Sequence, residues 1–166
     1  NECPDIPGDF EHISSDQNPT PGRNLYMCKI NIYDKSHYIN DVNIIIFLYG
    51  CHFNNTDSPN NGGAINIIMQ NSDQQGKTLH IENCVFSFCD GNNGGAISLV
   101  SEIDITYNLT NNKFYNNIAK STGGAIHLQG PRIIITGCHF IDDLSRNEYT
   151  NGDEMFINHL IPDNCN

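Results

Sequence analysis

Gly94-Gly95-Ala96-Ile97 is the central copy of a four-residue motif that decides the fold of this chain. Full copies occupy residues 62–65 and 123–126, and a degenerate copy, Gly152-Asp153-Glu154-Met155, comes last. Consecutive copies begin 32, 29 and 29 residues apart, which is the period of a repeat architecture. A unit this short cannot bury its own apolar face, so the copies must stack on one another.

A short apolar strand and a segment that ends in Phe precede each glycine pair at a fixed offset. The segment reads Cys51-His52-Phe53, Cys84-Val85-Phe86, Asn112-Lys113-Phe114 and Cys138-His139-Phe140. Upstream of it, two aligned positions are apolar and are expected to point inward: Ile46, Leu79, Tyr107 and Ile133, then Leu48, Ile81, Leu109 and Ile135. This period of two indicates strands. The positions between them are expected to face outward.

Bends are expected at two points of each repeat. Gly50, Asn83, Asn111 and Gly137 follow the apolar strand, and all tolerate a positive φ. The glycine pairs Gly62-Gly63, Gly94-Gly95 and Gly123-Gly124 form the other bend and lead into another strand. In that strand the side chains of Asn66, Ser98 and His127 are expected to face outward.

Aligned repeats of this kind predict an all-β right-handed parallel β-helix, a solenoid of about four to five coils with two or three strands each. Residues 1–24 contain four prolines and are expected to form an irregular N-terminal cap, and residues 25–166 the coils. Residues 29–32 resemble residues 64–67, which places Cys28 in the position of a second glycine.

Tandem Gly-Gly-Ala-Ile motifs that alternate with Phe-containing segments resemble the repeats of the polymorphic membrane protein family, whose members are chlamydial autotransporter adhesins. That family combines the glycine motif with Phe-x-x-Asn, which is present here as Phe114-Tyr115-Asn116-Asn117. At the same offset the other repeats have Thr56, Cys89 and Asp143. The resemblance covers residues 45–157 and implies a parallel β-helix with a surface-exposed, non-enzymatic adhesive or structural role.

Composition excludes some partners and indicates a compartment. The formal charge is −11 with 8 Lys+Arg and no basic cluster, so no nucleic-acid partner is expected. No apolar run approaches the roughly 18 residues of a membrane span. Seven cysteines and two sequons, at Asn54 and Asn108, predict a secreted, extracellular or cell-surface glycoprotein. The chain opens without a Met or a signal peptide, as a mature form or an excerpt would.

All seven cysteines are disulfide candidates: Cys3, Cys28, Cys51, Cys84, Cys89, Cys138 and Cys165. Cys51 and Cys84 share an inward position, so they either form a disulfide or pack as buried thiols. Cys89 is another candidate partner of Cys84. Cys3 could pair with Cys28, and a bridge involving Cys3 or Cys165 would fix the ends of the chain. Because seven is odd, at least one thiol is free or pairs with another chain.

No metal site or cofactor is expected. His52 follows Cys51 and His139 follows Cys138, but neighbouring residues on a strand point to opposite sides. The chain also lacks the Cys-x-x-Cys spacing that is typical of zinc sites.

No catalytic site is expected either, because the acidic residues do not form a continuous file. Asp57 and Asp90 occupy equivalent loops, but we expect Lys120 in the next coil. The remaining candidates concentrate in the last repeat: Asp142, Asp143, Asp153 and Glu154. There is no Trp, and most aromatic residues are assigned to inward positions, so no platform for stacking sugars is expected.

Three classes of function remain open. The leading one is a non-enzymatic structural or adhesive protein of a cell surface or extracellular assembly, with a host or matrix glycan or protein as ligand. The second is a head-to-tail filament, since both ends of a β-helix carry unpaired strand edges. The third is a carbohydrate-active enzyme, which requires Asp57, Asp90 and the acids of the last repeat to converge.

Overall fold

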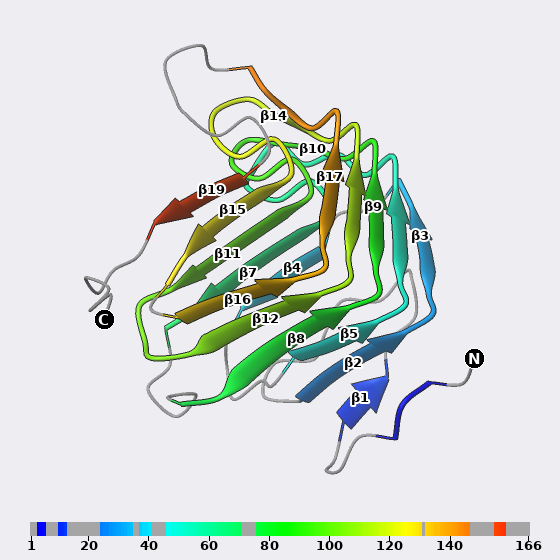
Figure 1. The fold of residues 1–166 in the computed structure, drawn as a ribbon, viewed down its shortest axis with the longest axis vertical. Helices are drawn as coiled ribbons and strands as arrows, with labels where there is room; N and C mark the ends of the chain where they lie inside the picture. The colour runs from blue at the N-terminus through cyan, green and yellow to red at the C-terminus, as the bar shows by residue number, and fades with distance from the viewer. Residues whose placement is uncertain are drawn as a thin grey trace.

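The structure, a computed structural model, describes residues 3–5, 10–12, 24–34, 37–40, 46–70, 76–130, 132–146 and 155–158. Within these residues the chain is all-β, with nineteen strands, no helix, and parallel pairing throughout. This part of the chain therefore offers no helical segment that could cross a bilayer. The strands stack in successive coils, as in a β-solenoid (Figure 1).

Two sheets form the first half of each coil. Sheet 1 lies at the front of Figure 1 and contains β1 (Phe10–His12), β2 (Asn24–Cys28), β5 (Ile46–Tyr49), β8 (Thr78–Glu82), β12 (Thr106–Thr110) and β16 (Arg132–Thr136). Sheet 2 stands to its right and contains β3 (Asn31–Tyr33), β6 (His52–Asn54), β9 (Val85–Ser87), β13 (Lys113–Tyr115) and β17 (His139–Ile141).

Two further sheets complete the coil. Sheet 3 is short and contains β10 (Asp90–Gly91), β14 (Ile118–Ala119) and β18 (Leu144–Ser145). Sheet 4 lies behind sheet 1 in Figure 1 and contains β4 (His37–Asn40), β7 (Ile65–Met69), β11 (Ile97–Ser101), β15 (Ile126–Gln129) and β19 (Met155–Asn158). The central coils thus have four strands each, and the two or three expected from the sequence were too few.

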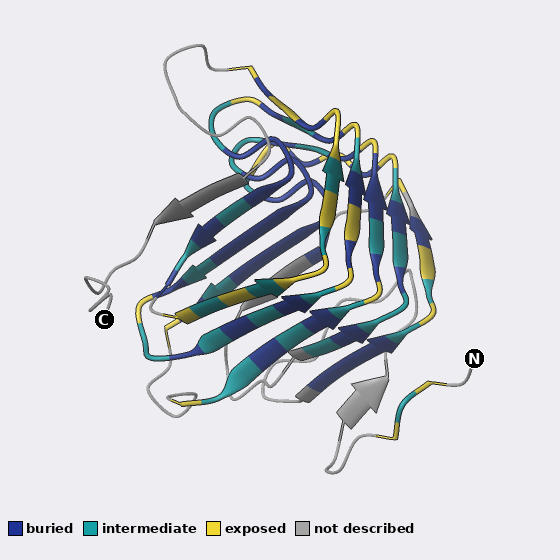
Figure 2. Ribbon diagram, viewed as in Figure 1, coloured by how far each residue is buried: buried dark blue, intermediate teal, exposed yellow. Residues whose placement is uncertain are grey.

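The registers of the coils follow the repeat. In sheet 1, Tyr107 lies between Leu79 and Ile133, and Leu109 between Ile81 and Ile135. Leu79, Tyr107, Ile81 and Leu109 are all buried, whereas the residues between them are half-exposed, so the strands alternate as predicted (Figure 2). The core is therefore a set of vertical files of apolar side chains, each contributed by one position of the repeat.

One of these files is a stack of phenylalanine rings. Phe53, Phe86, Phe114 and Phe140 lie in register in sheet 2. Their ring centroids are 4.8, 5.0 and 4.9 Å apart, and neighbouring planes differ by 4°, 6° and 5°. This separation matches the roughly 4.8 Å spacing of adjacent strands. Backbone pairing and ring stacking therefore favour the same register.

The predicted bends are present. Gly50, Asn83, Asn111 and Gly137 all have a positive φ, between 52° and 64°. The two glycines of the pair are needed for different reasons. Gly94 has a φ of +70°, which disfavours a side chain, and a Cβ added at Gly95 would collide with the backbone of Gly124 and Ile118. The first glycine thus permits the turn, and the second allows adjacent coils to approach closely.

The side chains of the strand after the glycine pair differ from expectation. Ser98 and Asn66 are buried and His127 is half-buried, although all three were expected to face solvent. At His127, Thr122 of the loop before the glycine pair lies against this face of sheet 4. The hydroxyl of Thr122 lies 3.0 Å from Nδ1 of His127. Burial disfavours the charged imidazole and lowers the pKa of His127.

The expected alignment of the first coil was wrong. Residues 29–32 do not match the strand after a glycine pair, because Lys29 sits at the bend with a φ of 51° and Ile32 pairs with Phe53. Cys28 pairs with Tyr49 in sheet 1 and does not replace a glycine. The first coil lacks the glycine motif, so local similarity of Ile and Asn residues gave a false register.

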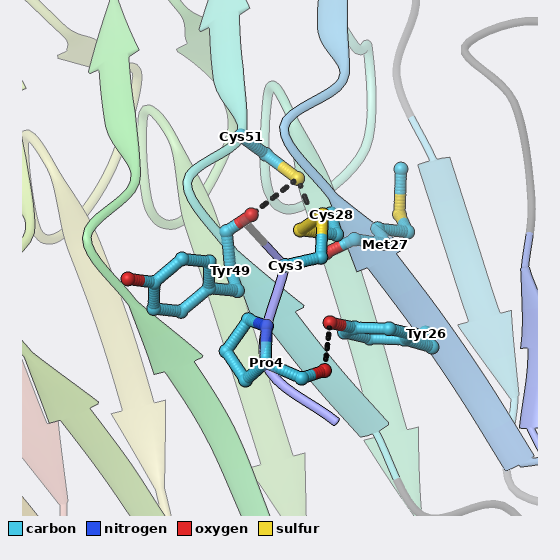
Figure 3. The surroundings of a disulfide bond; sticks show 7 residues. All are labelled: Cys3, Pro4, Tyr26, Met27, Cys28, Tyr49 and Cys51. Carbon is cyan, nitrogen blue, oxygen red and sulfur yellow. Dashed lines mark hydrogen bonds between the residues drawn. A yellow bond between two sulfur atoms is a disulfide. The ribbon is translucent and has the colours of Figure 1, made fainter. Parts of the chain in front are cut away.

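The N-terminal segment is attached to sheet 1 of the first coil. Within residues 1–24, expected to be irregular, Phe10–His12 form β1 and extend sheet 1 by pairing with β2. A disulfide joins Cys3 to Cys28, and the hydroxyl of Tyr26 donates to the carbonyl of Pro4 at 2.8 Å (Figure 3). Leu25, Met27 and Ile32 of the first coil are fully buried.

The phenylalanine stack gives a test of the packing. Phe86→Ala removes a fully buried ring between two others, so we expect it to lower the free energy of unfolding by about 3–5 kcal/mol. Phe88→Ala is the matched control, because Phe88 lies two residues away and is 58% exposed; we expect a change within about 0.5 kcal/mol. Urea unfolding of both variants measures the difference. Equal losses would contradict the assignment of Phe86 to the core.

Candidate functional site

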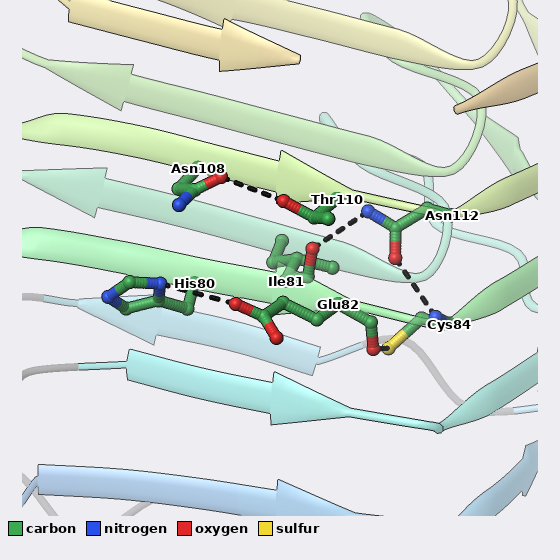
Figure 4. A network of polar contacts seen from close by, with 7 residues as sticks. All are labelled: His80, Ile81, Glu82, Cys84, Asn108, Thr110 and Asn112. Carbon is green, nitrogen blue, oxygen red and sulfur yellow. Dashed lines mark hydrogen bonds and ion pairs between the residues drawn. The ribbon is translucent and has the colours of Figure 1, made fainter. Parts of the chain in front are cut away.

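The bend between sheets 1 and 2 is held by a buried asparagine. Oδ1 of Asn112 accepts a hydrogen bond from the backbone N–H of Cys84 at 2.9 Å, and its Nδ2 donates to the carbonyl of Ile81 at 2.8 Å (Figure 4). The side chain thus satisfies two backbone groups of the preceding coil. Asn112 stands where the other coils have Cys51, Cys84 and Cys138, and its side chain forms two backbone hydrogen bonds at this position.

The bend after sheet 2 uses the same device. Oδ1 of Asn117 accepts from the N–H of Cys89 at 3.0 Å, and Nδ2 donates to the carbonyl of Phe86 at 3.1 Å. One coil further, Oδ1 of Asp143 accepts from the backbone N–H and the side-chain amide of Asn117 at 2.9 and 2.8 Å. The last residue of the Phe-x-x-Asn segment is therefore buried and links adjacent coils.

The cysteines divide into one bridge and a group of thiols. Among the described cysteines, Cys3 and Cys28 form the bridge, and Cys51, Cys84, Cys89 and Cys138 are free. Neither the Cys51–Cys84 nor the Cys84–Cys89 disulfide is present. Cys165 lies outside the described residues. The sequence allowed Cys51 and Cys84 either to form a disulfide or to pack as buried thiols, and the structure shows buried thiols.

Burial controls the ionisation of these thiols. It raises the pKa of Cys84 well above the usual value and that of Cys89 to about 11. The pKa of Cys138 rises as well, although this thiol is only half-buried. A hydrogen bond from the side chain of Cys84 lowers the pKa of Cys51, so Cys51 ionises first in this pair.

The acidic residues converge only in part. Asp57 and Asp90 lie on adjacent coils and are joined by a parallel bridge. The next residue of this file is Ile118 and not Lys120, as the pairing of β10 with β14 shows. Asp143 points into the core, and Asp142 is exposed at a bend. Asp153 and Glu154 lie outside the described residues.

A hollow of about 290 Å³ lies where sheet 2 turns into sheet 3, and we call it the Phe88 pocket. Its lining residues are Asn55, Thr56, Asp57, Phe88, Cys89, Asp90, Asn116 and Ile118. The volume is at the lower end of the roughly 300–1,000 Å³ range of small-molecule sites. Another hollow, of about 400 Å³, is lined by Lys29, Tyr49, Gly50 and Asn83 at the first bend.

Phe88 is the exceptional residue of this pocket. It has a φ of 54° and 58% of its surface is exposed, and both features are unusual for a large aromatic side chain. The equivalent positions of the other coils hold Asp34, Asn55, Asn116 and Asp142, which all have a positive φ too. Asn and Asp tolerate this conformation, whereas Phe does not. Strain of this kind, at a residue that lines a hollow, points to a role outside the fold.

The charges around the pocket are mostly negative. Oδ1 of Asp90 is buried and has no hydrogen-bond partner among the described residues. Its other oxygen, Oδ2, lies 3.9 Å from Nη2 of Arg146, whose side chain is 55% exposed. Asp57 adds a second carboxylate on the adjacent coil. Sequence reasoning named both aspartates but missed Phe88, although a Phe in a file of Asn and Asp was a visible signal.

The two sequon asparagines are half-exposed on the outer faces of β6 and β12. Oδ1 of Asn54 accepts from the hydroxyl of Ser87 at 3.2 Å, and Oδ1 of Asn108 accepts from that of Thr110 at 2.9 Å (Figure 4). Glycosylation of Asn54 and Asn108 stays a prediction.

The last coil has an open edge in the described part of the chain. There, β16, β17 and β18 are the outermost strands of sheets 1, 2 and 3. Ile133, Ile135 and Phe140 are half-exposed, whereas Tyr107, Leu109 and Phe114 one coil earlier are buried (Figure 2). Ile134, Ile141 and Leu144 are large exposed apolar residues of the same coil. We call this coil, residues 132–146, the C-terminal edge.

Comparison of the chain with protein-family models, curated proteins and solved structures found no match. The resemblance to the polymorphic membrane protein repeats therefore stays an interpretation of the motifs. In the described residues no group of His, Cys, Asp and Glu is arranged to hold a metal ion. The Phe88 pocket and the C-terminal edge are the two candidate sites.

Replacement of Phe88 tests whether its conformation is strained. Phe88→Asn restores the residue type of the neighbouring coils, so we expect the free energy of unfolding to rise by about 0.5–1 kcal/mol. Asn116→Phe is the reciprocal change in the next coil and should lower it by about 1 kcal/mol. Urea unfolding of both variants measures these changes. A loss of stability in Phe88→Asn would show that Phe88 is part of the packing.

Thiol reactivity tests the burial of the cysteine files. A pKa of about 11 leaves about one Cys89 thiol in a thousand ionised at pH 8, and Cys51, Cys84 and Cys89 are also closed to solvent. We expect iodoacetamide to modify Cys138 before these three, with peptide mapping by mass spectrometry as the measurement. Modification of Cys84 or Cys89 as fast as that of Cys138 in native protein would contradict the structure.

Proposed function

We propose that this chain is a non-enzymatic structural or adhesive module of a cell surface or extracellular assembly, built as a right-handed parallel β-helix. Parallel crossovers are right-handed in nearly all proteins, and the motif pattern resembles that of a family of surface adhesins. The Cys3–Cys28 disulfide and the two half-exposed sequon asparagines support an oxidising compartment.

The difference between the two ends of the solenoid is the observation on which this proposal rests. At the N-terminal end, β1 pairs with β2 and the Cys3–Cys28 bond holds the chain against sheet 1, while β3 and β4 are the outermost described strands of sheets 2 and 4. Leu25, Met27 and Ile32 of this first coil are nevertheless buried. At the C-terminal edge the inward apolar side chains of Ile133, Ile135 and Phe140 stay half-exposed. An uncovered edge of a sheet offers backbone groups and apolar surface to another strand. The C-terminal edge is therefore the end at which association takes place.

The proposed occupant of this edge is a second copy of the chain. A two-fold axis through the edge brings β16 of one copy against β16 of the other, so both open edges are covered at once. Such a pair is closed and does not grow. The head-to-tail filament needs unpaired edges at both ends, and the pairing of β1 with β2 at the N-terminal end of sheet 1 makes it the weaker alternative.

The carbohydrate-active enzyme is the remaining alternative, and among the described residues only the pair Asp57 and Asp90 supports it. These carboxylates lie on adjacent coils, but Asp143 is directed into the core and does not join them. Incubation of the protein with a panel of polyuronides and neutral glycans tests this alternative. Turnover that disappears in Asp90→Asn would replace the structural proposal with an enzymatic one.

Particle mass in solution tests the proposal. We expect the chain to form a dimer by light scattering, and we expect Ile141→Lys on β17 to dissociate it, because a charge on an edge strand opposes pairing. Val85→Lys is the matched control: it introduces the same charge on β9 of sheet 2, at a position where the next coil already has Lys113. A monomer at the highest attainable concentration, or a filament by electron microscopy, would contradict the proposal.

A further inference from the structure

We propose that the Phe88 pocket binds the guanidinium group of an arginine side chain on a partner protein. The inference goes beyond the structural role above and does not depend on it. The pocket is lined by residues between 55 and 118, whereas the C-terminal edge consists of residues 132–146.

The charged side chains of the pocket are hydrogen-bond acceptors. Oδ1 of Asp90 is closed to solvent, so a ligand in the hollow reaches this half-exposed carboxylate through Oδ2. Asp57 places a second carboxylate on the adjacent coil. A guanidinium carries five N–H donors and no acceptor, in a planar fork that fits carboxylates. Its chemistry therefore complements these two residues.

Phe88 supplies the apolar surface that a guanidinium prefers. Its ring is largely exposed and lines the same hollow as the two aspartates. Arginine stacks on aromatic faces and is more weakly hydrated than a lysine ammonium. A strained Phe at a position where the other coils have Asn or Asp is explained by such stacking, which Asn cannot provide.

The charge balance of the chain favours the same ligand. The formal net charge is −11, which attracts cationic partners and repels anionic ones. Arg146 of the same chain already approaches Oδ2 of Asp90 to 3.9 Å. This contact shows that the site accommodates a guanidinium on one side. This contact offsets the charge of Asp90 only, so the exposed carboxylate of Asp57 stays available to a ligand.

The experiment is an NMR titration of the uniformly ¹⁵N-labelled chain with the blocked peptide acetyl-Gly-Arg-Gly-amide. We expect saturable shifts of the backbone amides of Asn55, Phe88 and Asn116, which surround the pocket. The control peptide has citrulline in place of arginine and so keeps the shape and loses the charge. We expect it to bind at least tenfold more weakly.

Variants locate the binding. Phe88→Asn removes the ring, with no loss of stability expected, and Asp57→Asn removes one exposed carboxylate. Each should weaken arginine-peptide binding at least fivefold. Glu102→Gln is the matched control, because it makes the same change of charge at an exposed residue that directly follows β11 and does not line the pocket. It should leave the affinity unchanged.

Three results would overturn the inference. The first is equal binding of the citrulline peptide, and the second is the absence of saturable shifts up to the solubility limit of the arginine peptide. The third is saturation of the pocket by a neutral monosaccharide such as glucose when the arginine peptide does not bind, which would assign the site to a sugar. None of these results changes the particle mass, so failure here is distinguishable from failure of the proposed dimer.

Discussion

The in-register stacking of equivalent residues on adjacent coils is the constraint on which the rest of the structure depends. Four parallel sheets share one repeat, so a shift of one residue in any strand would move its apolar file out of the core. The phenylalanine rings, 4.8 to 5.0 Å apart, oppose such a shift because ring spacing and strand spacing coincide. Asn112 and Asn117 oppose it at the bends, since each bonds to two backbone groups of the coil before it.

The sequence was sufficient to predict what repeats. The inward files of sheets 1 and 2, the positive φ at Asn83 and Asn111, and the register of the glycine pairs all follow from positions that recur in each unit. Prediction failed where the repeat is incomplete or where the chain folds back. The first coil lacks the glycine motif, and its register was misassigned. Ser98 and Asn66 are buried although the alternation of the strand predicts that they face solvent.

The candidate sites were harder to predict because they lie at departures from the repeat. Asp57 and Asp90 were recognised as equivalent, but their pocket depends on Phe88, which takes the place of Asn or Asp in a single coil. The solenoid can tolerate this strained residue because the bend is fixed by the coils on both sides. The C-terminal edge is exposed because it is the last coil of sheets 1 to 3 in the described part of the chain. Its apolar residues occupy repeat positions that are buried one coil earlier.

The most direct test of the stacking is a set of nuclear Overhauser contacts between coils. The structure pairs Ile97 with Ile126 and Leu99 with Leu128 in sheet 4, and Leu79 with Tyr107 in sheet 1. We predict strong contacts between these partners, which lie about one repeat apart in the sequence. Contacts that instead join neighbouring strands of one coil in antiparallel order, such as β8 with β9, would contradict the stacked parallel fold.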